Sequence, residues 1–188
     1  TASRAYVAIG ANLGDARATA RQAMGELAAL PGTRVSARSS LYRSAPVDAQ
    51  GPDFINAVVE LETELDPTAL LAELQRLENG AGRQRPYRNA PRTLDLDLLR
   101  HGDVVMVTAA LTLPHPRMAE RAFVLVPLAE IAPELVTPAQ LAQVADQRIE
   151  RHVGIDIRID GDVADLHEAE RIAIRIGFGD SLCPDIAA

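Results

Sequence analysis

The first half of the chain alternates between short apolar runs and stretches with apolar residues at helical spacing. Residues 6–9 are an apolar run of the kind found in buried strands. Residues 15–30 carry Ala, Met and Leu at helical spacing and end at a Pro-Gly pair, which predicts a helix. Residues 35–42 and 54–65 predict two further strands, because both are rich in strand-forming residues and a loop with Pro and Gly separates them.

The pattern continues in the following segments. Residues 66–80 predict a helix that begins with an Asp-Pro pair, since Asp is a favourable N-cap and Pro fits the first helical turn. Residues 93–99 predict a strand, followed by a hairpin turn at 101–103 and another strand through Val107. Short helical segments are expected to continue to about residue 134.

The order of these elements predicts the fold. Strand, helix, strand, strand, helix, strand is the split β-α-β pattern of ferredoxin-like folds, so we expect an α+β domain with an antiparallel sheet and helices on one face. Residues 145–188 differ in charge, with 5 Arg and 10 acidic residues against 14 Arg and 16 acidic residues in 1–144. We therefore predict a domain at 1–144 and an acidic C-terminal extension of unknown role, with a strand at 155–159 and a helix at about 165–176.

Composition narrows the chemistry. All 19 basic residues are Arg, which excludes the lysine-dependent phosphate loop, the kinase strand lysine and Schiff-base catalysis. Any phosphate chemistry would need Arg, backbone amides or a metal ion. The single Cys183 cannot form an internal disulfide. The sequence contains neither a long apolar run nor the features of a signal peptide at its start, so we expect a cytoplasmic protein.

Two aspartates on the strand at 93–99 are the most specific local feature. Asp95 and Asp97 would project from one face about 6–7 Å apart, while the alternating leucines point to the other face. Two carboxylates on one face are suited to magnesium, which proteins often hold with one or two carboxylates plus substrate phosphates. From this motif alone, two solvated acids on an amphipathic strand are the more frequent case.

An arginine cluster precedes the aspartates. It contains no acidic residue, and its members are Arg83, Arg85, Arg88 and Arg92. Guanidinium groups match phosphate oxygens, so a loop with several of them could close over a polyphosphate. A solvated basic loop and a nucleic-acid contact are the alternatives, although few aromatic residues and a net charge of −7 disfavour nucleic acid. Gln75 and Glu78 on the preceding helix would lie near this loop, but solvation is the more frequent role of such a pair.

The remaining candidate site residues include three aromatic or imidazole side chains, which are scarce in this sequence: Phe54, His115 and Phe123. Phe54 and Asn56 would share one face of a strand and offer an apolar surface beside an amide, which suits a flat polar heterocycle. Downstream, His115 lies between two prolines, and Arg121 and Phe123 follow closely. A lone histidine in a proline-rich loop is usually structural.

Together these motifs resemble a known family, the 6-hydroxymethyl-7,8-dihydropterin pyrophosphokinases of the folate pathway. The resemblance covers roughly residues 4–144. The matching blocks, in order, are Tyr6 to Asp15, Leu41 to Pro46, Asp53 to Ala57, Arg88 to Leu99, Leu113 to Pro116, Arg121 to Phe123 and Pro127-Leu128. Such enzymes transfer diphosphate from ATP to the hydroxymethyl group of the pterin and release AMP.

The resemblance implies a role for each matching residue. Two magnesium ions would be held by Asp95 and Asp97. Residues implied at the ATP site are Gln75, Glu78, Arg85, Arg92, Leu98, His115 and Arg121. Residues implied at the pterin site are Ser44, Ala45, Val47, Phe54, Asn56 and Phe123. Arg83, Arg92 and Asp97 would assist the transfer, with Asp97 as a candidate acceptor of the hydroxyl proton.

Three positions depart from the family pattern. Asn89 stands where one branch of the family has Trp, Pro116 follows His115 where a Tyr is found, and Phe54 replaces a Tyr. The expected partners are ATP and the pterin, with no nucleic acid, no membrane and a monomeric state. Two rival hypotheses are a ferredoxin-like nucleotide or small-molecule sensor without catalysis and an RNA-binding module that uses the arginine loop.

Overall fold

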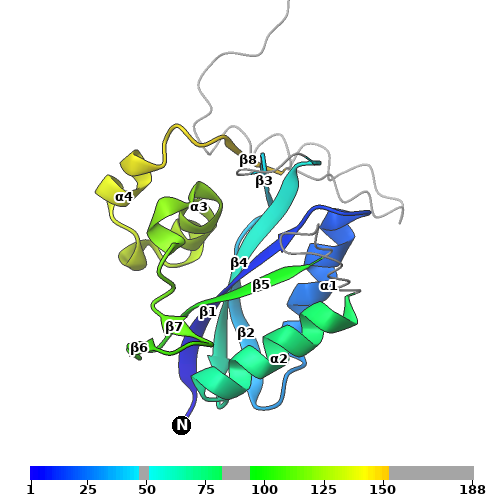
Figure 1. The fold of residues 1–188 in the computed structure, drawn as a ribbon, viewed down its shortest axis with the longest axis vertical. Helices are drawn as coiled ribbons and strands as arrows, with labels where there is room; N and C mark the ends of the chain where they lie inside the picture. Colours follow the sequence, from blue (N-terminus) through cyan, green and yellow to red (C-terminus); the bar gives the residue numbers. More distant parts are fainter. Residues whose placement is uncertain (47–50, 82–93, 153–188) are drawn as a thin grey trace, which may run out of the picture. The chain divides into compact units, whose positions relative to one another are not determined.

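An antiparallel sheet organises the computed structural model, which describes residues 1–46, 51–81 and 94–152 (Figure 1). Its strands run in the order β5-β1-β4-β3-β8, and β2 pairs with β4 beside β3. The strands are β1 (Ser3–Ala11), β2 (Thr33–Arg38), β3 (Tyr42–Ser44), β4 (Phe54–Thr63), β5 (Asp95–His101) and β8 (Ile149–Arg151). Every pairing within this sheet is antiparallel. The predicted α+β fold with its ferredoxin-like strand arrangement is confirmed.

Two helices cover one face of the sheet. They are α1 (Ala16–Ala28) and α2 (Pro67–Gly80), and Figure 1 shows both on the same side. The predicted N-cap of α2 is present, because the Asp66 side chain accepts a hydrogen bond from the Ala69 N–H at 2.7 Å. The leucine stripe of α2 and the alanines of α1 pack on the sheet in one apolar cluster, here called the first core.

A third helix lies on the opposite face, which corrects the prediction of helices on one face only. This helix, α3 (Ala122–Ile131), packs on Tyr6, Ala8, Val58 and Leu99 in a second core. The sequence of α3 is apolar nearly all round, and such a helix needs cover on several sides. Short elements around it are η1 (Met118–Glu120), η2 (Pro133–Leu135) and α4 (Pro138–Gln143). The second core covers only part of this face.

Two predicted strands have different bounds or partners in the structure. The strand expected at 35–42 is interrupted after β2, because Ser39 bonds to Val58 of β4 through both its backbone N–H and its side-chain oxygen. The turn expected at 101–103 and the strand ending at Val107 are present, but the pairing of that strand with β5 in a hairpin is wrong. The strand β6 (Met106–Val107) pairs with β7 (Thr112–Leu113) in a separate small sheet, because the chain turns away from β5 at Gly102, where φ is 51°.

Strand β8 extends the sheet beyond residue 144. It pairs with β3, so Tyr42 lies opposite Arg151 and Ser44 opposite Ile149. The compact unit that contains the described residues runs from Thr1 to Val153. The boundary after residue 144 stays a prediction, and the strand and helix expected at 155–159 and 165–176 lie outside the described residues.

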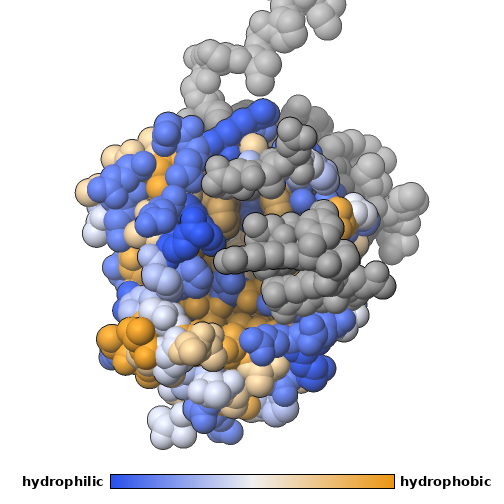
Figure 2. Space-filling model, in the orientation of Figure 1, coloured by the Kyte–Doolittle hydropathy of each residue, from blue (hydrophilic) through white to orange (hydrophobic). Residues whose placement is uncertain are grey.

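Two surface features bear on what the fold could contact. Within the described ranges, no helix is long and apolar enough to cross a membrane. Figure 2 shows apolar surface around the β6–β7 hairpin, where Val104, Val105 and Val107 are exposed. Elsewhere in that view hydrophilic surface alternates with apolar surface, part of which lies just below the grey residues.

Candidate active site

Strand β5 separates apolar and acidic side chains onto the two faces of the sheet. Leu94, Leu96 and Leu98 are buried in the first core, whereas Asp95 and Asp97 are half-buried and face the side of α3. The predicted alternation is confirmed. The magnesium-binding role of the two aspartates stays a prediction.

A glycine lies between the acidic strand and the polar end of β4. Gly10 of β1 is opposite Asp95 on one side and Asn56 on the other. A Cβ atom on Gly10 would lie 3.5 Å from Asn56 Oδ1, 3.9 Å from Asp95 Cβ and 4.0 Å from Phe54 Cδ1. Glycine therefore leaves room for about one further carbon atom between these three side chains. Glycine inside a strand often marks a place where a ligand comes close to the backbone.

Asn56 is fixed by a neighbouring hydroxyl. Its Nδ2 donates to Ser44 Oγ at 2.6 Å, and both side chains are buried. The register of β3 and β4 places Ser44 opposite Phe54. Three of the side chains predicted for the pterin are therefore together at the end of β4 nearest β3.

A pocket adjoins these residues. Its volume is about 140 Å³, and its lining comes from β3 and the next two residues, the start of α3 and the turn before β8. The lining residues are Ser44, Ala45, Pro46, Ala122, Phe123, Gln147 and Arg148. Three of them, Ser44, Ala45 and Phe123, were predicted for the pterin from the resemblance.

The start of α3 brings a cation and an aromatic ring to this pocket. Arg121 is the residue before the first turn of α3, and its guanidinium carbon lies 5.5 Å from the centre of the Phe123 ring. A cation at this distance from a ring face is attracted by the ring quadrupole. Phe123 thus lines the pocket, and the Arg121 guanidinium lies beside its ring.

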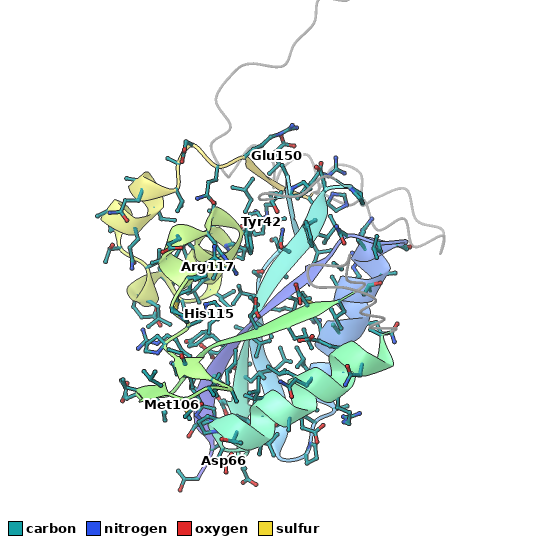
Figure 3. The ribbon with its side chains drawn as sticks, viewed as in Figure 1. Tyr42, Asp66, Met106, His115, Arg117 and Glu150 are labelled. Carbon is teal, nitrogen blue, oxygen red and sulfur yellow. The ribbon has the colours of Figure 1, made fainter. Side chains whose placement is uncertain are left out.

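His115 lies in the segment between β7 and α3, where Figure 3 labels it together with Arg117. The Asp97 carboxylate is near enough to act on its pKa. The histidine's backbone N–H donates to Leu99 O of β5 at 2.8 Å, and its Nδ1 accepts from the Arg117 N–H at 3.2 Å. Burial lowers the pKa of His115, the Asp97 carboxylate raises it, and Arg121 and Arg117 lower it further, so the net pKa is below the ordinary value. A neutral imidazole with its proton on Nε2 follows.

The two predicted polar residues of α2 have different environments. Gln75 is exposed, whereas Glu78 is buried and accepts a hydrogen bond from the Leu96 N–H of β5 at 3.3 Å. Solvation, the simpler expectation for both, is therefore wrong for Glu78. Because β5 ends the strand order among the described residues, this carboxylate bonds to a backbone N–H that none of the described strands satisfies.

Several predicted residues lie outside the described part of the chain. They are Val47, Arg83, Arg85, Arg88 and Arg92, together with the departure at Asn89. Among the residues that are described, no three His, Cys, Asp or Glu side chains group closely enough to hold a metal ion. A metal at Asp95 and Asp97 would therefore need further oxygen ligands from a substrate or from water.

Two residues of this region were not predicted from the sequence. Gly10 interrupts an apolar run, and a glycine in a strand could have been recognised as a possible ligand contact. Gln147 lines the pocket from far along the chain. No local pattern around it indicates this position.

Comparison with known proteins decides the family. Residues 6–133 match the family described as 7,8-dihydro-6-hydroxymethylpterin-pyrophosphokinase (HPPK). The chain belongs to the HPPK family. The resemblance inferred from the sequence motifs is confirmed, and the match ends just after α3.

Bacterial HPPK relatives are similar over most of their length. The 2-amino-4-hydroxy-6-hydroxymethyldihydropteridine pyrophosphokinase of Haemophilus influenzae is 46% identical over 135 residues, which are 71% of this chain and 84% of that protein. The enzyme of the same name from Methylorubrum extorquens is 47% identical over 135 residues, with 71% and 85% covered. That of Bacillus subtilis is 42% identical over 140 residues, with 74% and 84% covered.

A solved structure supports the HPPK fold. It is described as HPPK-DHPS in complex with substrates, and it superposes with a TM-score of 0.56 at 14% sequence identity. The match covers 71% of this chain but only 41% of that chain. At this identity the likeness concerns the fold alone.

Proposed function

We propose that this site transfers diphosphate from ATP to the hydroxymethyl group of 6-hydroxymethyl-7,8-dihydropterin and releases AMP, the folate-pathway reaction for which the HPPK family is named. The observation that carries this proposal is the polar half of the sheet face shared with α3. There Asp95, Gly10 and Asn56 are opposite one another on adjacent strands. Acidic groups, an open surface and an amide are thus side by side without an intervening side chain.

Asp95, Gly10 and Asn56 form a row across three adjacent strands, here called the polar row. The oxygen donors at its acidic end fit magnesium. Asp95 and Asp97 offer carboxylate oxygens from one face of a rigid strand, and His115 beside Asp97 is held neutral, so it adds no competing positive charge. We propose that these aspartates hold two magnesium ions together with the ATP phosphates. When bound, the ions would neutralise phosphate charge.

The ATP site would extend from the aspartates toward α2 and α3. We assign to it Glu78, whose carboxylate fixes the start of β5, and Gln75 one turn earlier on α2. On the other side, Arg121 offers a guanidinium for phosphate and His115 an Nε2 donor. Leu98 would contact the nucleotide through its backbone. The roles predicted for Arg83, Arg85 and Arg92 stay predictions.

The pterin would occupy the other end of the row. Phe123 and Phe54 offer ring faces for stacking, and Asn56 presents an amide whose orientation is fixed by Ser44. The pocket of about 140 Å³ is smaller than the ~300–1,000 Å³ of most ligand sites, so part of the heterocycle would lie over Gly10. Backbone groups at Ser44, Ala45 and Val47 would complete the polar contacts.

The reaction needs positioning more than a covalent group on the protein. The pterin hydroxyl oxygen attacks the β-phosphorus of ATP, the bond from that phosphorus to the α-β bridging oxygen breaks, and AMP leaves. We assign Asp97 to accept the hydroxyl proton, and Arg83 and Arg92 to stabilise charge during transfer. Exclusion of water matters because water would compete as the acceptor.

Product identity tests this proposal. The folded protein is incubated with ATP, magnesium and 6-hydroxymethyl-7,8-dihydropterin, and the nucleotide and pterin products are separated by chromatography. We expect AMP and a pterin diphosphate in equal amounts. ADP as the product, or no turnover by a folded sample, would contradict the proposal.

The product assay, together with an ATP titration and an RNA titration at several salt concentrations, separates the rival functions. A sensor without catalysis would bind ATP and release no AMP. An RNA-binding module would show tight binding that weakens steeply with salt, because that affinity comes from phosphate contacts. The predicted monomer and cytoplasmic location stay predictions.

A further inference from the structure

The side chain of Gln147 joins the turn before β8 to the start of α3. Its Oε1 accepts a hydrogen bond from the Ala122 N–H at 2.9 Å, and its Nε2 donates to Glu120 O at 2.8 Å. These two backbone groups lie on either side of Arg121. One amide therefore fixes the peptide units before and after this arginine.

The start of α3 depends on such a partner. A helix begins with N–H groups that have no acceptor within the helix, and a Ser, Thr, Asp or Asn at the N-cap usually accepts one of them. Here the N-cap residue is Arg121, whose side chain makes no capping bond, and Ala122 is buried. Gln147, 25 residues further along, supplies the acceptor.

Gln147 is itself held in place. Its backbone N–H donates to Val144 O at 3.0 Å, and β8, which begins two residues later at Ile149, pairs with β3. The residue is therefore connected to the same strand that carries Ser44. A side chain that is to orient others needs this kind of support.

Gln147 also lines the pocket. It shares the lining with Ser44, Ala45 and Phe123, and the ring of Phe123 is in contact with the guanidinium of Arg121. A loss of the two Gln147 hydrogen bonds would therefore free the peptides that aim Arg121 and Phe123. These are the side chains assigned to ATP and to the pterin.

We propose that Gln147 is a positioning residue that orients Arg121 and Phe123 for the two substrates. This inference rests on the proposed function for the identity of those substrates. It adds to the site a residue beyond the part of the chain that matches the HPPK family. The turn before β8 thereby becomes part of the substrate-binding machinery.

Three variants test this role. Gln147→Leu keeps the approximate size and removes both hydrogen bonds, whereas Gln147→Glu keeps an acceptor for Ala122 N–H and loses the donor to Glu120 O. Gln143→Leu is the matched control, because Gln143 is exposed at the end of α4. Each variant is measured by equilibrium titration with the pterin and with a non-hydrolysable ATP analogue, by steady-state kinetics, and by hydrogen exchange at Ala122.

We expect Gln147→Leu to weaken pterin binding about 10-fold and ATP-analogue binding less, with faster exchange of the Ala122 amide, while Gln143→Leu matches the wild type. Gln147→Glu should fall between Gln147→Leu and the wild type in pterin affinity. Equal ligand affinities in Gln147→Leu and Gln143→Leu would overturn the positioning role, even if Ala122 exchanged faster. A Gln147→Glu variant that binds the pterin no more tightly than Gln147→Leu would also overturn the positioning role.

The binding measurements keep the two proposals separate. A wild type that binds both ligands without turnover would overturn the proposed function alone, and the affinity ratio between the Leu variants would still decide the role of Gln147. A folded wild type that binds neither ligand would overturn both proposals.

Discussion

The two faces of the sheet are made by the same strands but differ in what covers them. Against α1 and α2, the first core joins apolar residues from Ala5 to Leu113, and the buried polar side chains beside it, such as Glu78 and Thr63, are hydrogen-bonded. On the α3 face, an apolar cluster covers one part and polar groups occupy the rest. Because side chains alternate along a strand, packing one set of residues against α1 and α2 leaves the intervening residues on the other face, where they can contact ligands.

Strand β5 shows this division within a few residues. Leu96 and Leu98 are almost completely buried, whereas Asp95 and Asp97 between and before them are half-buried on the other side. Because side chains alternate along a strand, rigid packing of the leucines also fixes the direction of the carboxylates. Stability and catalysis can therefore be perturbed separately on one strand.

The largest effect is expected on the polar face. Asp95→Asn and Asp97→Asn should each lower kcat/KM about 1,000-fold, equal to about 4 kcal/mol of barrier, because an amide cannot replace a carboxylate as a magnesium ligand. The urea unfolding midpoint should change little, since both side chains are only half-buried. Turnover close to that of the wild type in either variant would contradict a shared metal site.

The matched change on the other face should affect stability. Leu96→Ala removes a side chain that is 3% exposed in the first core, so the free energy of unfolding should fall by about 2–5 kcal/mol. At a temperature where the variant is fully folded, its KM values should remain within a few-fold of the wild type. Loss of turnover without loss of stability would show that the two faces are not separable.

A smaller effect is expected at Gly10, in the middle of the polar row. A Cβ there meets neighbours only at ordinary contact distances, so Gly10→Ala should fold normally. The added carbons would fill the surface proposed for the pterin and raise the pterin KM by roughly 10-fold for Ala and more for Val. The ATP KM should change less. An unchanged pterin KM in Gly10→Val would show that the pterin does not bind over Gly10.

The smallest effect is expected at an ion pair on the solvent side of β2 and β4. Arg34 Nη2 lies 2.6 Å from Glu62 Oε2, but the two side chains are 67% and 35% exposed. Arg34→Ala should therefore lower the free energy of unfolding by at most about 1 kcal/mol and leave turnover unchanged. A larger loss of unfolding free energy, measured by urea titration, would contradict the small contribution expected of an exposed ion pair.

The sequence alone predicted the elements that depend on local patterns. The cap at Asp66 and the alternation in β5 are each encoded within a few residues, and both are present. The family could also be recognised, because several motifs occur in the right order. Of the candidate site, the grouping of Ser44, Phe54, Asn56 and Phe123 followed from that resemblance.

The features that sequence reasoning missed depend on contacts between distant residues. Helix α3 covers the second face partly through packing on β1 and β4, more than 60 residues away, and no periodicity indicates which face an apolar helix will cover. The break between β2 and β3 comes from Ser39 bonding to Val58. Burial of Glu78 follows from its bond to Leu96 N–H across 18 residues.

Manganese binding, followed by electron paramagnetic resonance, tests the central claim most directly. Mn²⁺ takes the place of magnesium, and α,β-methylene-ATP supplies phosphates without allowing transfer. We predict weak Mn²⁺ binding by the protein alone, tight binding of two ions with the analogue, loss of that binding in Asp97→Asn, and full retention in Leu96→Ala. Undiminished Mn²⁺ binding in both Asp95→Asn and Asp97→Asn would contradict the account.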